Sequence, residues 1–146
     1  MNIKVVYHSS TGNTKKIADA IADTLSTKAL SVSDPQNISS EPIDLLFIGD
    51  GIYAGKISKK TAKFIQNLNA DNVKFAAVFT TYGGQNKAVD EMKQLLRNKK
   101  IRFVSESFDC KGQSWFFMNR KHPNDIDVNA AREFAKKAVA NITNGK

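Results

Sequence analysis

Cysteine is the scarcest reactive residue in this chain of 146 residues, because Cys110 is the only one. An intrachain disulfide is therefore excluded, and a reducing compartment suits such a chain. No apolar run approaches the roughly 20 residues that cross a bilayer. The first residues also lack the basic and apolar zones of a secretory signal. We therefore expect a cytoplasmic protein with no membrane partner.

Patterns for metal binding or nucleophilic catalysis are also missing. His8 and His122 have no Asp or Cys at metal-ligand or triad spacing, which favours structural roles for both. Segment 50–57 is not a Walker A loop, because Asp50 stands where the first glycine belongs and Ile57 replaces Ser or Thr. We predict no metal site, no catalytic side chain and no P-loop nucleotidase.

Positive charge is present in excess, with a net charge of +8. Between Lys56 and Arg102 there are 11 basic and 3 acidic residues, against 4 and 6 before this stretch and 7 and 5 after it. The middle third therefore carries the whole excess. Such a surface attracts an acidic protein, a nucleic acid or an anionic small molecule, or it is simply solvated.

Apolar runs typical of buried strands alternate with helical patterns along the chain. Such alternation predicts an α/β fold with a parallel sheet in which helices cover both faces. For five strands we favour the order 2-1-3-4-5, in one domain of residues 1–146, with the first and last helices on one face and the middle two on the other. The expected strands are 3–7, 29–32, 44–48, 73–80 and 101–108, and the expected helices are 15–26, one capped by Ser58, 86–98 and 127–142, with a helical turn in 33–42.

The turn after the first strand, Ser9-Ser10-Thr11-Gly12-Asn13-Thr14, is rich in hydroxyls and lies where a helix begins. Backbone amides of the turn and the unpaired amides of the helix start converge there, and the helix dipole favours negative charge. Such a turn either caps the helix or binds a phosphate, and the spacing favours the phosphate.

Two further loops are expected at the same edge of the sheet, because ligands of open α/β sheets bind beyond the carboxyl ends of the strands. They are 49–58 and 80–85, and each has a tyrosine beside glycines, Tyr53 and Tyr82. Both tyrosines are either loop anchors or platforms for a ring. A planar ring system attached to a phosphate would satisfy all three loops.

The spacing Ser-x-Thr-Gly-x-Thr after a first strand resembles the phosphate loop of the flavodoxin family. The segments Gly51-Ile52-Tyr53-Ala54-Gly55 and Thr80-Thr81-Tyr82-Gly83-Gly84 look like the two loops that flank the flavin ring there. The resemblance covers essentially the whole chain and implies a flavodoxin-like three-layer sandwich that binds FMN. The chain departs from the family in two ways, because its second loop has no tryptophan and its charge is basic where well-known flavodoxins are acidic. The residues that the resemblance assigns to FMN are Ser9, Ser10, Thr11, Gly12, Asn13, Thr14, Gly51, Ile52, Tyr53, Ala54, Gly55, Thr80, Thr81, Tyr82, Gly83, Gly84 and Gln85.

The resemblance implies an electron-transfer protein that shuttles electrons between a reductase and an acceptor enzyme. The alternatives are an FMN-dependent reductase, a dedicated flavodoxin-like activator of a partner oxidoreductase, and a binding module without flavin. A carrier is favoured over an enzyme, because the chain has no second glycine-rich fingerprint for NAD(P)H and no acid–base pair near the three loops. The expected partners are redox proteins with an acidic docking surface, without nucleic acid, and the expected state is a monomer or weak dimer.

Overall fold

The computed structural model describes residues 1–10, 12–34, 41–52, 56–82, 87–111 and 123–144. Its strands form one parallel sheet in the order β2-β1-β3-β4-β5, which confirms the predicted topology. The strands are β1 (Ile3–His8), β2 (Ala29–Ser31), β3 (Ile43–Ile52), β4 (Val73–Tyr82) and β5 (Phe108–Lys111). The helices are α1 (Asn13–Thr24), α2 (Lys59–Gln66), the 3₁₀ turn η1 (Ala70–Asn72), α3 (Ala88–Asn98) and α4 (Asp125–Thr143).

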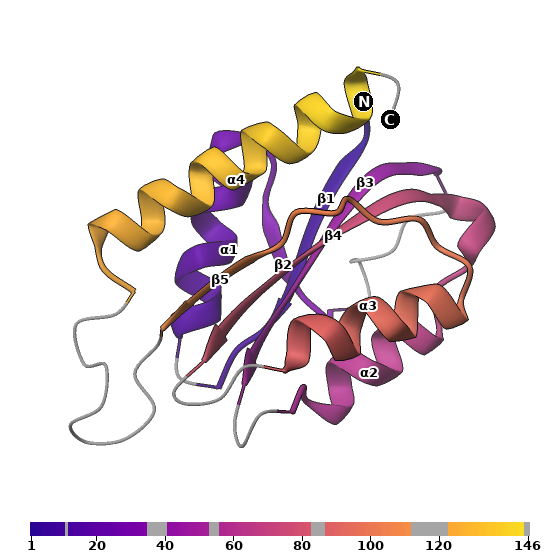
Figure 1. Ribbon diagram of the computed structural model, residues 1–146, viewed down its shortest axis with the longest axis horizontal. Coiled ribbons are helices and arrows are strands. Elements are labelled where there is room, and N and C mark those ends of the chain that lie inside the picture. Colours follow the sequence, from indigo (N-terminus) through magenta and orange to yellow (C-terminus); the bar gives the residue numbers. More distant parts are fainter. Residues whose placement is uncertain (11, 35–40, 53–55, 83–86, 112–122, 145–146) are drawn as a thin grey trace.

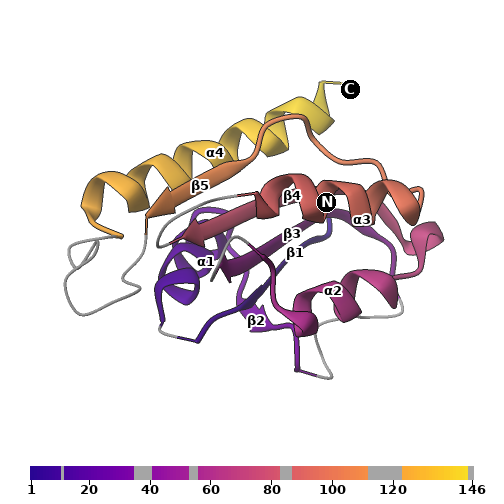
Figure 2. The ribbon, with the colours of Figure 1, turned by 60° about the horizontal axis from the view of Figure 1, so that its bottom comes forward.

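The helices cover both faces of the sheet, as predicted (Figure 1). On one face α1 and α4 pack on Val5, Phe47 and Phe79, and on the other α2 and α3 pack on Val6 and Ile48. Strand residues that alternate along β1 and β3 point to opposite faces, so both cores are drawn from the same strands. Turned by 60°, the ribbon shows α4 running alongside β5 (Figure 2). The central strands β1, β3 and β4 are thereby buried on both sides, and only their ends meet solvent.

Local sequence accounts for how several helices begin. Ser58 is the N-cap of α2, as predicted, and its Oγ accepts a hydrogen bond from Thr61 N–H at 3.1 Å. At α4, Asn124 and Asp127 form a capping box in which each side chain accepts from the other's backbone N–H. Among the described residues no helix is long and apolar enough to cross a bilayer.

Three predicted strand boundaries were wrong. The third strand continues through Gly49 to Ile52, and the fourth continues to Tyr82, because these residues keep pairing across the β3–β4 ladder. The fifth strand was expected at 101–108, but β5 begins at Phe108. Before it, one isolated bridge joins Phe103 to Ala76, since Ala76 N–H donates to Arg102 O and Val104 N–H donates to Ala76 O. Most of the helical turn expected in 33–42 falls outside the described residues.

Candidate functional site

The carboxyl ends of β1, β3 and β4 lie at the same edge of the sheet, because the three strands are parallel and paired in register (Figure 1). Across this edge His8 of β1 pairs in register with Asp50 of β3, and Asp50 pairs with Thr80 of β4. The sequence after β1 leads directly into the start of α1. Because strand order reverses between β1 and β3, this is the switch point where open α/β sheets bind ligands.

The segment from Ser9 to Thr14 turns the chain from β1 into α1. Gly12 is the N-cap of α1, with a φ of 92°, in the left-handed region that favours glycine. Ser9 Oγ accepts a hydrogen bond from Gly12 N–H at 3.0 Å, and Ser10 is exposed. Thr11 lies outside the described residues. A Cβ built on Gly12 would meet no atom of the described residues within 4 Å, chain neighbours aside.

The start of α1 has no negative charge of its own. Its N-cap makes no side-chain hydrogen bond and its first turn has no acidic residue, whereas α2 has the Ser58 cap, α3 has acids in its first turn and α4 has both. The first turn of α1 instead has Lys15 and Lys16. Both ammonium groups have partners, since Lys15 Nζ pairs with Asp19 Oδ2 at 2.7 Å and Lys16 Nζ donates to Pro123 O at 2.9 Å. The positive end of the helix dipole therefore favours an anion at this point.

A buried hydroxyl pair joins this turn to the end of β4. The Oγ1 atoms of Thr14 and Thr81 lie 2.8 Å apart, with 1% and 3% of the two residues exposed. Gly51 of β3 lies against the pair, since a Cβ added there would stand 2.9 Å from Thr14 Oγ1. Residues from α1, β3 and β4, all among those predicted for FMN, are thus in direct contact. A hydroxyl that accepts from its partner can still donate its own proton outward.

The other predicted residues lie at the ends of β3 and β4 where they are described. Ile52 and Tyr82 are paired in register, and Thr80 is fully buried. Tyr53, Ala54, Gly55, Gly83, Gly84 and Gln85 lie outside the described residues, and the side chains of Ile52 and Tyr82 are not described. The ring-binding roles of these residues stay predictions.

His8 and Asp50 form a pair that sequence reasoning missed. His8 was expected to lack an acidic partner, but its Nδ1 lies 3.3 Å from Asp50 Oδ1. The other oxygen, Asp50 Oδ2, accepts from Ser58 N–H at 2.6 Å. The two residues are 42 apart in sequence, so no local spacing could indicate them. Only the β1–β3 register brings them together.

Burial raises the pKa of two acids of the chain. It raises the pKa of Asp50, against the opposing effects of Ser58 N–H, His8 and Thr61. Burial also raises the pKa of Cys110 to about 12, and the nearby carboxylates of Asp127 and Asp109 add to the shift. A thiol with that pKa is protonated and unreactive at neutral pH.

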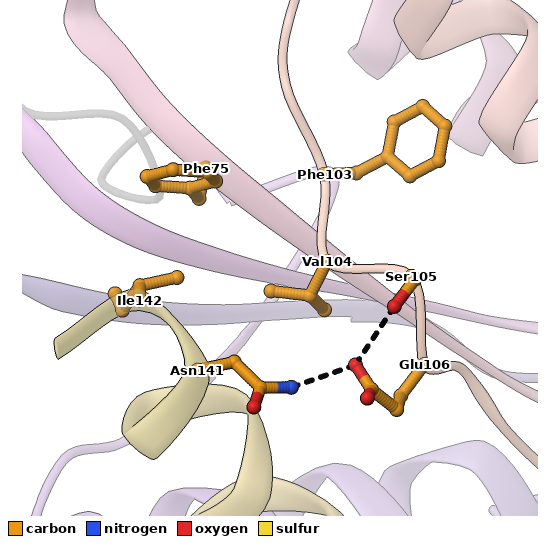
Figure 3. Close-up of a pocket in the computed structure, with 7 residues that line it drawn as sticks. All are labelled: Phe75, Phe103, Val104, Ser105, Glu106, Asn141 and Ile142. Atoms are coloured by element: carbon orange, nitrogen blue, oxygen red, sulfur yellow. Dashed lines mark hydrogen bonds between the residues drawn. The ribbon is translucent and has the colours of Figure 1, made fainter. Parts of the chain in front are cut away.

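A cavity of about 390 Å³ lies elsewhere, between the start of β4, the segment before β5 and the end of α4 (Figure 3). The rings of Phe75 and Phe103 line it. Glu106 Oε2 accepts hydrogen bonds from Ser105 Oγ and Asn141 Nδ2 (Figure 3). The polar groups in this cavity contact one another, and Phe75 is near the amino end of β4, away from the candidate site.

The candidate site fits the phosphate group of a flavin. The first turn of the helix has no acidic residue, no described atom lies within 4 Å of where a Gly12 Cβ would stand, and a side chain at Gly51 would crowd the Thr14 hydroxyl. Described groups suited to a phosphate oxygen are hydroxyls and backbone N–H donors, with no carboxylate in the turn itself.

Comparison with known proteins identifies the family of the chain. The model of the flavodoxin domain matches residues 4–112. An uncharacterized protein of Methanocaldococcus jannaschii is 32% identical over 148 residues, covering 94% of this chain and 95% of the relative. A flavodoxin from the domain Archaea has the same fold, with a TM-score of 0.81 at 18% identity, over 98% of this chain and 99% of that one. The rubredoxin oxygen:oxidoreductase of Desulfovibrio gigas matches 97% of this chain with 36% of its own, at a TM-score of 0.76 and 14% identity.

The family match spans most of the chain, and the sheet order is the one that the fold requires. The family implies a flavin cofactor at the edge where β1, β3 and β4 end. This chain belongs to the flavodoxin family.

Proposed function

We propose that this protein binds FMN and carries electrons between a reductase and an acceptor enzyme. Bound FMN would supply the redox chemistry, while the protein supplies binding, orientation and electrostatics. The observation that carries the proposal is the uncapped, acid-free start of α1 beside the buried Thr14–Thr81 pair, at the switch point of a flavodoxin-like sheet.

The residues from Ser9 to Thr14 would hold the phosphate. Backbone N–H groups at the start of α1 point toward one volume, and hydroxyls of the turn add donors. Thr81 can donate to Thr14 Oγ1 across the 2.8 Å contact, which would orient the Thr14 proton toward the phosphate. We assign Thr81 a supporting role through Thr14, at the base of the phosphate loop.

The flavin ring would lie between the segments that follow β3 and β4, which contain Gly51–Gly55 and Thr80–Gln85. Tyr53 and Tyr82 are the aromatic residues of these segments. Each would contribute about 0.5 to 1.5 kcal/mol by stacking, beyond the area that it buries.

Basic residues beside the site would select the redox partner. Lys56, Lys59, Lys60, Lys63 and Lys87 are all exposed, and they flank the ends of β3 and β4 or lie on α2. A surface of one sign steers a partner of the opposite sign and makes association depend on ionic strength. The proposed partner therefore presents an acidic surface, and its binding weakens as salt rises.

The test is titration of the purified protein with FMN, followed by flavin fluorescence and the visible spectrum. Thr14→Ala removes one charge-assisted hydrogen bond, so we expect a loss of about 1.5 to 3 kcal/mol, or roughly ten- to a hundredfold in affinity. Thr14→Ser keeps the hydroxyl and is the matched control, for which we expect less than half of that loss in free energy. Equal FMN affinity of wild type and Thr14→Ala would contradict the phosphate assignment.

The alternative is a protein dedicated to one oxidoreductase, or a reductase itself. The resemblance to part of a rubredoxin oxygen:oxidoreductase supports this second candidate, since there the same fold forms about a third of a larger enzyme chain. NAD(P)H oxidation by the FMN-loaded protein alone would identify a reductase. Oxidation only when a separate reductase is added would identify a carrier.

A further inference from the structure

The pair of His8 and Asp50 lies between the segments proposed to hold FMN. His8 immediately precedes the turn that begins at Ser9, and Asp50 immediately precedes Gly51. Val6 and Ile48 pack on the face of the sheet that α2 and α3 cover. His8 and Asp50 lie two residues further along the same strands, so the pair lies on that face as well. Asp50 is fully buried, whereas 21% of the His8 side chain is exposed. One member is therefore fixed in the protein and the other can exchange protons with water.

The contacts of Asp50 explain why the pair responds as a unit. Its two oxygens face different groups, because Oδ2 accepts from Ser58 N–H at 2.6 Å and Oδ1 lies 3.3 Å from His8 Nδ1. A buried carboxylate is costly unless it is hydrogen-bonded and paired or protonated. When the pair holds one proton beyond the neutral imidazole and the carboxylate, its net charge is zero, and when it loses that proton, its net charge is minus one. This change is the same whichever atom held the proton.

The environment of the pair combines neutral hydrogen-bonding groups with charged residues of the neighbouring segments. Thr61 and Ser58 of the α2 start are neutral, and Thr61 also contributes a hydrogen bond to Asp50. Among the described residues, His8 Nδ1 is the basic nitrogen within ion-pair distance of Asp50, and the ring is charged only when both of its nitrogens are protonated. The charged residues of the neighbouring segments that the structure describes are Asp34 after β2, Lys56, Lys59, Lys60 and Lys63 before and on α2, and Lys87, Asp90, Glu91, Lys93 and Arg97 before and on α3. Of these, Glu91 accepts from Ile57 N–H through Oε1.

We propose that His8 and Asp50 form a proton-binding site that couples proton uptake to reduction of the bound flavin. The inference rests on the proposed function, and it adds regulation of the same site. An electron from the redox partner adds negative charge to the flavin, and that charge favours the protonated pair. In the coupled step the redox partner would supply one electron to bound FMN, and water would supply one proton to the His8–Asp50 pair, which would return it on oxidation. No other covalent bond of the protein would form or break.

The coupling makes reduction of the flavin pH-dependent in a defined direction. The effect is confined to the pH range in which the pair is deprotonated in the oxidised protein and protonated in the reduced protein. Within that range, each rise of one pH unit lowers the equilibrium constant for reduction by up to about tenfold. Low pH therefore makes the protein easier to reduce, beyond any proton uptake by the flavin itself.

The test compares the FMN-loaded protein with three variants by potentiometric titration from pH 5 to 9. His8→Gln keeps a polar side chain without the charge change, and Asp50→Asn keeps an acceptor for Ser58 N–H. His122→Gln removes the only other histidine and is the matched control. In wild type and His122→Gln we expect the reduction potential to depend on pH more steeply than proton uptake by the flavin alone requires. In His8→Gln this additional dependence should be lost. An unchanged profile in His8→Gln, or its loss in His122→Gln, overturns the proposal.

A second measurement follows the His8 ring directly by NMR titration, with His122→Gln used for assignment. The midpoint of the His8 titration should lie at higher pH in the reduced protein than in the oxidised protein. In apo-protein, Asp50→Asn should move it to lower pH, since the imidazolium loses its carboxylate. Equal midpoints in the oxidised and reduced proteins overturn the coupling while FMN binding stands. Failure of the wild-type protein to bind FMN overturns the proposed function itself and the coupling with it.

Discussion

Gly51→Ala tests whether the contact between β3 and the Thr14–Thr81 pair determines the shape of the site. The new Cβ would lie 2.9 Å from Thr14 Oγ1 and 3.6 Å from Thr81 Oγ1. An ordinary contact begins at 3.4 Å, so Thr14 Oγ1 would have to move by about half an ångström. That movement stretches or breaks the 2.8 Å hydrogen bond between two buried hydroxyls.

The magnitude follows from two opposing effects. Leaving buried hydroxyls without their partner costs about 1 to 3 kcal/mol, and alanine in place of glycine recovers about 0.5 to 1 kcal/mol within a strand. We expect a net loss of about 1 to 2 kcal/mol in the free energy of unfolding. The corresponding fall in Tm is roughly 3 to 8 °C. FMN affinity should fall as well, because Thr14 belongs to the proposed phosphate loop.

The assay is urea unfolding of apo-protein for wild type, Gly51→Ala, Thr14→Ala and the double variant. If the Thr14 hydroxyl causes the loss, Gly51→Ala should cost little in the Thr14→Ala background, with a coupling energy of about 1 kcal/mol. Additive losses would show that the cost arises from another contact. Stability equal to wild type in Gly51→Ala alone would refute the steric argument.

Two further predictions concern the buried acids. Cys110 should react with a thiol reagent at pH 8 only as fast as the protein unfolds, because burial keeps the thiol protonated; stoichiometric reaction within the mixing time in native buffer would contradict this. Because burial raises the pKa of Asp50, the folded protein loses stability as pH rises from about 4 through the raised pKa. The free energy of unfolding of Asp50→Asn minus that of wild type should therefore grow with pH over this range in urea titrations, and a constant or shrinking difference would show that ionised Asp50 is not penalised.

Much of the fold followed from residue patterns that act locally. Alternating strand and helix patterns require a parallel sheet with covered faces, so the order 2-1-3-4-5 and the assignment of helices to faces were predictable. The Ser58 cap was predictable for the same reason, since a cap depends on residues three apart. The position of the Ser9–Thr14 turn depends only on the strand and the helix that flank it.

Strand ends and the fifth strand depended on neighbours that a sequence pattern does not contain. Gly49 and Gly51 are typical of a strand's end, yet both continue β3 because β4 pairs with them. Segment 101–108 has the apolar residues of a strand, but at the edge of the sheet it can pair only with β4. It does so at a single bridge at Phe103, and the continuous ladder begins at Phe108. Pairing across the sheet, rather than propensity, decided both boundaries.

The residues of the phosphate turn were evident because they are contiguous, so their chemistry and their spacing could be read together. The contacts that organise the site join residues far apart in the chain, 67 positions for Thr14 and Thr81 and 42 for His8 and Asp50. Nothing in the sequence around His8 indicates an acidic partner, and nothing around Asp50 indicates that it is fully buried. The parallel register of β1 with β3 places the two residues opposite each other, and the packing of α2 excludes water from the carboxylate. The sequence by itself therefore determined the contiguous turn that we propose for the phosphate, and only the tertiary structure brought His8 and Asp50 together, because strand register and helix packing join residues that are distant in the chain.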